Sequence, residues 1–282
     1  MEIDLPAGTI HYREYGDGEP VVFVHGFAVD GQLWEPVAEL LSQQGLRCIV
    51  PTWPFGSHRT PMKPDADLAP PAAALIIRDF LEALDLTGVT IVANDSGGAV
   101  TQMLLTTDRS RIGRIVLTNC DSFENFPPDG FKLLAKTGRL PGAGFMLAQS
   151  MRFELFIRAP FAFGALNSER QPIELLRSFV EPLITDKRIR RDAMKFFGAA
   201  HARDTLAAAE KLPDVDVPAL IVWGEDDKFF PISDAERLAR TLPNAKLVRV
   251  PDAKTFVSLD QPEAVADAIA AFVAANPRST VI

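Results

Sequence analysis

Cysteine and histidine are scarce in this sequence, and neither a long apolar run nor a basic run is present. The chain has 282 residues and two cysteines, Cys48 and Cys120, both in or next to strand-like runs. Two isolated thiols argue against a disulfide framework and favour a reducing compartment. No apolar run reaches membrane-spanning length. The formal net charge of −8, with no basic run to offset it, argues against a nucleic-acid or anionic-membrane partner.

The sequence also lacks the motifs that hold common cofactors. Gly142-Ala143-Gly144 has neither the third glycine nor the preceding strand of a dinucleotide site. No phosphate-loop lysine motif is present, and no His, Cys or Asp cluster has metal-ligand spacing. The acidic N-terminus lacks the charged and apolar regions of a signal peptide. We therefore expect a cytoplasmic protein without a cofactor or metal, and we leave a homodimer open.

Short apolar runs alternate with amphipathic segments through most of the chain, which predicts a mostly parallel sheet covered on both faces. The alternation stops between residues 121 and 205, which carry no clear buried strand, and it resumes at Pro218. The sequence therefore predicts an α/β core of residues 1–120 and 206–282 with an inserted helical cap of residues 121–205. The expected strands are 2–5, 9–15, 21–24, 47–50, 89–93, 112–118, 218–223 and 245–250. The expected helices outside the cap are 31–44, 72–84, 99–105, 233–242 and 261–274.

One stretch, residues 89–100, links a buried strand to a helix through a turn of small and polar residues. Its central part, Ala93-Asn94-Asp95-Ser96-Gly97, fits the pattern small-x-nucleophile-x-small of a nucleophile elbow. A second frame would put Ser96 at the tip. We favour Asp95, because this frame leaves Ala93 at the crowded first position and puts two glycines where the helix packs close to the strand. A helix cap alone would explain Asp95 and Ser96, but not the paired glycines.

Three further motifs follow the expected strands in order. They are His25-Gly26-Phe27, Trp223-Gly224-Glu225-Asp226-Asp227 and Pro251-Asp252-Ala253-Lys254-Thr255-Phe256. Together with the elbow they resemble the α/β-hydrolase fold from about Val21 to Val273. The resemblance implies an eight-stranded, mostly parallel sheet flanked by helices. An aspartate at the elbow tip is similar to the branch of haloalkane dehalogenases, fluoroacetate dehalogenases and epoxide hydrolases.

This resemblance implies roles for individual residues. Asp95 would be the nucleophile, which attacks carbon without a base to deprotonate it first. The backbone N–H groups of Ser96 and Phe27 would form the oxyanion hole. Asp227 would be the acid that orients a histidine. Fallback positions for this acid are Asp226, Glu225 and Asp121.

The sequence departs from the family at the histidine itself. Thr255 stands where the family places its general base, and a threonine cannot accept a proton from water at neutral pH. Ser96 also occupies the place of the halide-binding tryptophan of haloalkane dehalogenases, which weakens that specific interpretation. The whole chain has four histidines: His11, His25, His58 and His201.

Three explanations of this departure stay open. A divergent hydrolase would use another base, with His58 or His201 ahead of Lys254, while His25 is expected to be structural. A non-hydrolytic enzyme (a lyase, isomerase, decarboxylase or cyclase) would use Asp95 as a general acid or base. A binding module would use Asp95 only as a polar group in a ligand pocket.

Phenylalanine is concentrated in the expected cap, and most of these rings would seal it onto the core. Because caps over this fold line the pocket, an aromatic lining favours a small or medium hydrophobic molecule as the partner. Of the 19 phenylalanines, 11 lie between residues 121 and 205: Phe123, Phe126, Phe131, Phe145, Phe153, Phe156, Phe161, Phe163, Phe179, Phe196 and Phe197.

Overall fold

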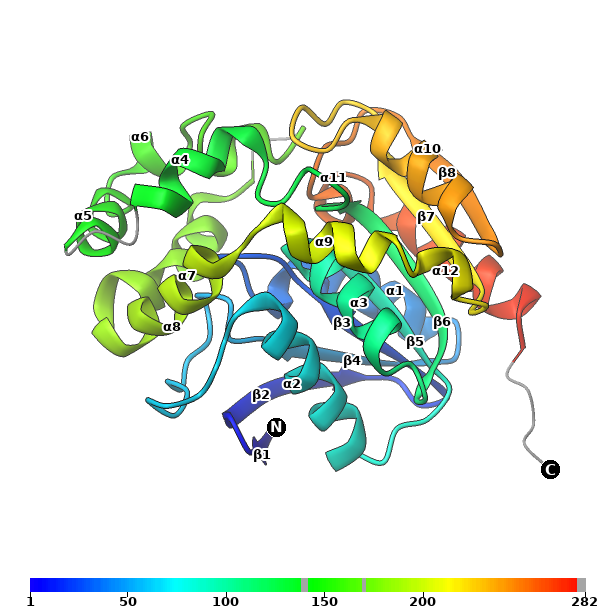
Figure 1. The fold of residues 1–282 in the computed structure, drawn as a ribbon. Helices are drawn as coiled ribbons and strands as arrows, with labels where there is room; N and C mark the ends of the chain where they lie inside the picture. The colour runs from blue at the N-terminus through cyan, green and yellow to red at the C-terminus, as the bar shows by residue number, and fades with distance from the viewer. Residues whose placement is uncertain (138–141, 169–170, 278–282) are drawn as a thin grey trace.

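A single eight-stranded sheet forms the centre of the molecule (Figure 1). The computed structural model describes residues 1–137, 142–168 and 171–277. The strands lie in the order β1-β2-β4-β3-β5-β6-β7-β8, with antiparallel β1–β2 and β2–β4 pairs and parallel pairs elsewhere. The predicted α/β fold with a mostly parallel sheet is therefore confirmed. The strands are β1 Glu2–Leu5, β2 Gly8–Tyr15, β3 Glu19–Val24, β4 Leu46–Thr52, β5 Val89–Asp95, β6 Ile112–Cys120, β7 Ala219–Gly224 and β8 Ala245–Val250.

Two hydrophobic clusters cover the two faces of this sheet, as the alternation of side chains along a strand requires. On β3, Val22 and Val24 belong to one cluster, while Val21 and Phe23 belong to the other. The first cluster includes α2 Pro70–Ala83, α3 Ser96–Thr107, α9 Ala202–Ala209 and α10 Ile232–Thr241. The second includes α1 Glu35–Gln43, α11 Val257–Asp260 and α12 Pro262–Ala275. Both faces of the central strands are therefore dry, which explains their continuous apolar sequence.

The helix expected at residues 31–44 is two elements. A 3₁₀ turn, η1 Gly31–Leu33, is capped by Asp30, whose carboxylate accepts a hydrogen bond from the Gln32 N–H. The α-helix α1 then begins at Glu35, with Pro36 in its first turn. Proline has no N–H and fits the first turn of a helix, so a new helix starts here.

Between β6 and β7 the chain forms further helices, and Figure 1 shows α4 to α8 to the left of the sheet, with α9 next to α3. The predicted cap boundary at residue 205 falls inside α9, which packs against α3 of the core. We use "cap" for α4 to α8 and the turns between them. Its elements are α4 Asp129–Thr137, α5 Ala143–Ser150, α6 Glu154–Ile157, η2 Phe163–Ala165, α7 Ile173–Thr185 and α8 Lys187–Ala199.

Stacked aromatic rings join the cap to the core. Phe196 on α8 stacks on Phe55 with ring centroids 4.3 Å apart, and Phe197 stacks on Phe27 at 4.6 Å. Ser57 also donates a 2.6 Å hydrogen bond to the carbonyl oxygen of Phe179 on α7. The cap is therefore seated on the loops that follow β3 and β4.

The three tryptophans, Trp34, Trp53 and Trp223, lie in the core and are fully buried. The Trp53 indole N–H donates to the carbonyl of Phe23, and that of Trp223 donates to Phe230. None of the helices in the described part of the chain has the length and apolar character that a membrane crossing needs.

Candidate active site

Asp95 lies at the tip of the turn between β5 and α3, in a backbone conformation that few residues adopt. Its φ is 53° and its ψ is −137°, a strained combination for a residue with a Cβ. The turn is tight on both sides. A Cβ at Gly97 would lie 2.5 Å from the carbonyl oxygen of His25, and one at Gly98 would lie 2.3 Å from the Cβ of Cys120. Only glycine fits these two places, which is the crowding expected from the sequence.

Two backbone N–H groups face the Asp95 side chain. The N–H of Ser96 donates to Asp95 Oδ1, and the N–H of Phe27 also stabilises the carboxylate. Gly26 allows this approach, since a Cβ there would lie 2.5 Å from the Cβ of Asp95. The loop after β3 and the start of α3 therefore form a pocket of donors at the carboxyl edge of the sheet.

Opposing effects set the acidity of Asp95. Burial raises its pKa to about 6, the N–H groups of Ser96 and Phe27 act in the opposite direction, and the nearby charge of Asp227 adds to the rise. Asp95 is therefore a carboxylate at neutral pH, but one that takes a proton in mildly acidic solution.

Asp227 is buried behind the elbow and accepts four hydrogen bonds. Its Oδ1 accepts from the backbone N–H groups of Phe229 at 2.8 Å and Phe230 at 3.1 Å. Its Oδ2 accepts from Asn119 Nδ2 at 2.9 Å and from the Thr255 hydroxyl at 2.9 Å. Burial raises the pKa of Asp227, and the four donors oppose that rise. Its sequence neighbours Glu225 and Asp226 are exposed.

The histidines of the chain lie elsewhere. His58 is buried with its Nε2 3.3 Å from Asp192 Oδ2 on α8, and it is not among the described residues that line the cavity at Asp95. The His201 Nδ1 accepts a hydrogen bond from the N–H of Arg203 at the start of α9. The His25 Nδ1 donates to Gly26 and its Nε2 accepts from the Trp53 N–H. Burial lowers the pKa of His25 to about 4, so this ring is neutral.

Lys254, the weakest of the substitute bases considered, also makes its hydrogen bond to another residue than Asp95. Its Nζ donates to the carbonyl oxygen of Asn167 at 3.1 Å. The structure thus joins Asp95, Ser96 and Phe27, sets Asp227 with Thr255 behind them, and leaves His58, His201 and Lys254 apart. Within the described residues, His, Cys, Asp and Glu side chains form no group of three that could hold a metal ion.

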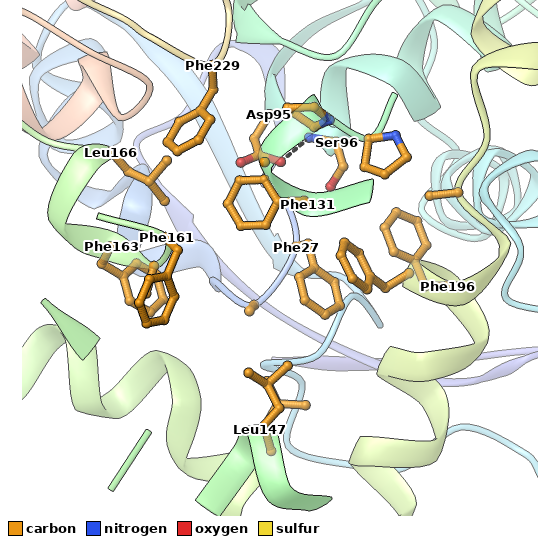
Figure 2. Close-up of a pocket in the computed structure, with 18 of the residues that line it drawn as sticks. Phe27, Asp95, Ser96, Phe131, Leu147, Phe161, Phe163, Leu166, Phe196 and Phe229 are labelled. Carbon is orange, nitrogen blue, oxygen red and sulfur yellow. Dashed lines mark hydrogen bonds between the residues drawn. The ribbon is translucent and has the colours of Figure 1, made fainter. Parts of the chain in front are cut away.

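A cavity of about 450 Å³ opens above Asp95 and Ser96, between the core and the cap. Figure 2 shows phenylalanine rings around the carboxylate, with Phe131 and Phe229 beside it and Phe27 and Phe196 further along. Among the described lining residues, the charged or ionisable side chains are Asp95, Asp121 and Arg190. The guanidinium of Arg190 donates to the carbonyls at the end of α7 and lies over the Phe145 ring. Apolar lining residues include Leu147, Met151, Phe161, Phe163, Leu166, Val180, Leu183, Met194 and Phe197.

The sheet order, the strained elbow and the cap between β6 and β7 together describe one superfamily. A model of the alpha/beta hydrolase family matches residues 21–268. This chain belongs to the alpha/beta hydrolase family.

Relatives of this alpha/beta hydrolase carry out different reactions. It is 29% identical over 295 residues to a cis-3-alkyl-4-alkyloxetan-2-one decarboxylase of Xanthomonas campestris pv. campestris, with 96% of this chain and 94% of the relative covered. It is 26% identical over 273 residues to haloalkane dehalogenase 2 of Mycobacterium tuberculosis, with 94% and 92% covered. A thermophilic esterase from Thermogutta terrifontis has the same fold, with a TM-score of 0.75, 23% identity and 98% of each chain covered.

Two features of this alpha/beta hydrolase were missed or undervalued in the sequence. Asn119 binds Asp227 from the end of β6, and Asp121 lines the cavity, although the sequence suggested Asp121 only as a fallback acid. Their position at the carboxyl end of a strand next to β5 was the available signal, because such strand ends meet at one edge of the sheet.

Proposed function

We propose that this protein is an enzyme in which the Asp95 carboxylate attacks an electrophilic carbon of a small or medium hydrophobic substrate and forms an ester with it. The observation that carries the proposal is a half-buried carboxylate at a strained elbow, held by two N–H groups and facing an apolar cavity. A carboxylate displaces a leaving group from carbon directly, without a base to activate it. The dry lining favours an alkyl substrate and leaves the carboxylate poorly hydrated.

The surroundings of Asp95 fit the needs of such an attack. A pKa of about 6 keeps the group ionised at pH 7.5, so the nucleophile is present without a partner base. The N–H groups of Ser96 and Phe27 stabilise negative charge on the carboxyl oxygen, including the oxyanion of a later attack on the ester. The likeness to haloalkane dehalogenase 2 supports carbon–halogen or carbon–oxygen bonds as the bonds that break.

The fate of the ester separates this protein from a hydrolase with a histidine base. Thr255 occupies the position behind Asp95, where its hydroxyl donates to Asp227, and it is fully buried. The described lining of the cavity contains no histidine. We therefore propose that release of the ester does not use histidine-activated water.

A second candidate function removes the need for water. In a four-membered lactone, Asp95 would bond to the ring carbon that carries the ring oxygen, and that carbon–oxygen bond would break to free a carboxylate. The bond from the neighbouring carbon to this carboxylate would then break, and its electron pair would form an alkene as the ester bond to Asp95 breaks. The products are carbon dioxide, an alkene and the original Asp95 carboxylate. The 29% identity to an oxetan-2-one decarboxylase favours this candidate.

The experiment that tests Asp95 is intact-protein mass spectrometry after incubation with 1-bromohexane, 1,2-epoxyhexane and a cis-3,4-dialkyloxetan-2-one. We expect the wild type either to gain the mass of the alkylating group (hexyl from the bromide, hydroxyhexyl from the epoxide) or to consume the electrophile, and we expect Asp95→Asn to do neither. Alkene and carbon dioxide from the lactone, measured in the headspace, would favour the second candidate.

Asp226→Asn, an exposed neutralisation outside the cavity, is the matched control and should behave as wild type. Equal adducts in wild type and Asp95→Asn would contradict the proposal. Ligand binding that survives Asp95→Asn, with no adduct or product from any of the three compounds, would show a binding module instead.

A further inference from the structure

Asp121 is a second carboxyl group that lines the cavity, and no contact of its side chain explains its burial. It is the first residue after β6, is 1% exposed and lines the cavity with Asp95. Its Oδ1 has no hydrogen-bond partner among the described residues. A buried polar atom without a partner is costly, so such an atom at a cavity wall indicates a contact with what enters the cavity.

The main chain holds Asp121 beside the elbow. Its N–H donates to the carbonyl oxygen of Asp95 at 3.3 Å, and its own carbonyl accepts from Gln102 Nε2 on α3 at 2.9 Å. The position of Asp121 is therefore set by the same strand and helix that set Asp95. The two carboxyl groups reach the cavity from adjacent strands, β5 and β6.

The two carboxyl groups differ in what surrounds them. Asp95 is stabilised as an anion by two N–H groups, whereas burial and the charges of Asp95, Asp227 and Asp234 raise the pKa of Asp121 well above its usual value. Burial and these neighbouring charges therefore favour the protonated form of Asp121. Two neighbouring carboxyl groups, one held as an anion by N–H donors and the other in surroundings that favour its protonated form, fit one nucleophile and one acid.

We propose that Asp121 is the proton donor of this site, which protonates the leaving oxygen when Asp95 opens the ring of a small hydrophobic epoxide. This inference rests on the proposed nucleophilic role of Asp95. It names the substrate class, because an alkoxide leaving from an epoxide is strongly basic and needs a proton, whereas a departing halide does not.

No other described group in the cavity is suited to this task. The chain has two tyrosines, Tyr12 and Tyr15, and both lie on β2, outside the cavity lining. Arg190 donates its guanidinium N–H groups to the backbone carbonyls of Leu183 and Ile184. The hydroxyl of Ser96 is a weak acid. Asp121 is the remaining donor.

The proton returns in a complete cycle. First, an Asp95 oxygen bonds to a ring carbon, the carbon–oxygen bond of the epoxide breaks, and the leaving oxygen takes the proton of Asp121. Water then attacks the ester carbonyl carbon while the Asp121 carboxylate takes one of its protons, and the N–H groups of Phe27 and Ser96 hold the oxyanion. The ester bond breaks, the second water proton goes to the departing diol oxygen, and both carboxyl groups regain their starting states.

The test compares two electrophiles of equal chain length, 1,2-epoxyhexane and 1-bromohexane, each consumed with protein in excess. In Asp121→Asn we expect epoxide consumption to slow by about 10²–10⁴-fold, and bromide consumption to stay within about threefold of wild type. The bromide arm also shows that the variant is folded. Asp226→Asn, an exposed carboxyl outside the described cavity lining, is the matched control and should leave both rates within about threefold.

The outcomes separate the two proposals. Asp121→Asn slowing both electrophiles equally, or neither, overturns the proton-donor role while the nucleophile stands. Wild-type protein that consumes neither compound, or Asp95→Asn that consumes both, overturns the role of Asp95 and with it this inference.

Discussion

The floor of the cavity, which the core forms, carries ionisable side chains, whereas its roof, which the cap forms, is mostly apolar. The floor comes from loops at the carboxyl edge of the sheet, and it carries the two carboxyl groups, Asp95 and Asp121, within a dense set of hydrogen bonds. The roof comes from the cap, and its described lining is apolar apart from Arg190. If Asp95 reacts as we propose, the chemistry belongs to the core and the selection of the substrate belongs to the cap.

Packing differs between these two regions as well. Of the described large hydrophobic side chains that are exposed, six lie within residues 145–161 of the cap: Phe145, Met146, Phe153, Leu155, Phe156 and Phe161. The central strands of the core, by contrast, are buried on both faces. The cap is held on the core by the aromatic stacks and by hydrogen bonds, such as those from the Met62 N–H to Asp192 and from Lys195 to the carbonyl of Ala66.

The largest expected effect comes from breaking the contact between roof and floor. Phe196→Ala removes a ring that is 1% exposed and stacks on Phe55, and it should lower the free energy of unfolding by about 3–5 kcal/mol. Phe161→Ala, whose ring lines the same cavity but is 57% exposed, should change it by less than about 0.5 kcal/mol. Urea denaturation measures both. Equal losses would show that the stack does not anchor the cap.

A smaller effect comes from the charge on the floor. The folded-state pKa of Asp95 is raised to about 6, above its usual value of 3.8, so between these pH values the folded protein binds more protons than the unfolded chain. Stability linked to Asp95 is therefore lost as pH rises from about 4 to about 6. Asp95→Asn has no carboxyl group here and so does not lose this stability. Between pH 4 and pH 7.5, its free energy of unfolding should rise by about 2–3 kcal/mol relative to that of wild type.

Urea denaturation across this pH range tests the linkage. The difference in the free energy of unfolding between Asp95→Asn and wild type should increase with pH. For Asp226→Asn, whose side chain is exposed, the difference from wild type should stay constant. In parallel, the rate of ester formation by wild type should rise with pH through about 6, because the carboxylate is the attacking form. A constant difference for Asp95→Asn would mean that this carboxyl is not shielded from water.

The smallest effect concerns the residue behind the floor. Thr255→Val removes one of four donors to Asp227 and should lower the free energy of unfolding by about 1 kcal/mol. It should leave the rate of reaction with 1-bromohexane within about threefold of wild type. Thr101→Val is the control, since the buried Thr101 hydroxyl has no partner among the described residues and its loss should cost nothing. A tenfold loss of rate in Thr255→Val alone would put Thr255 in the chemistry.

Local patterns in the sequence predicted much of the core. Alternating apolar runs located all eight strands, and the spacing of small residues around Asp95 located the strained turn, since both signals act between near neighbours. The break between η1 and α1 was missed, although Pro36 was a visible cause.

Contacts between distant segments could not be predicted in this way. His58 follows β4, which suggested a place at the cavity, but its ring meets Asp192 on α8. Nothing near His58 in the sequence indicates that partner. The bond from Thr255 to Asp227 and the exposure of Asp121 to the cavity likewise depend on how separate loops meet.

The positions of the tryptophans allow fluorescence to distinguish the core from the cap. Trp34, Trp53 and Trp223 all belong to the core, and residues 121–205 contain no tryptophan. Intrinsic fluorescence therefore follows the melting of the core and is blind to events confined to the cap. A single indole introduced at Phe163, a cavity-lining position of η2, would add a second emitter whose signal reports the arrival of a ligand.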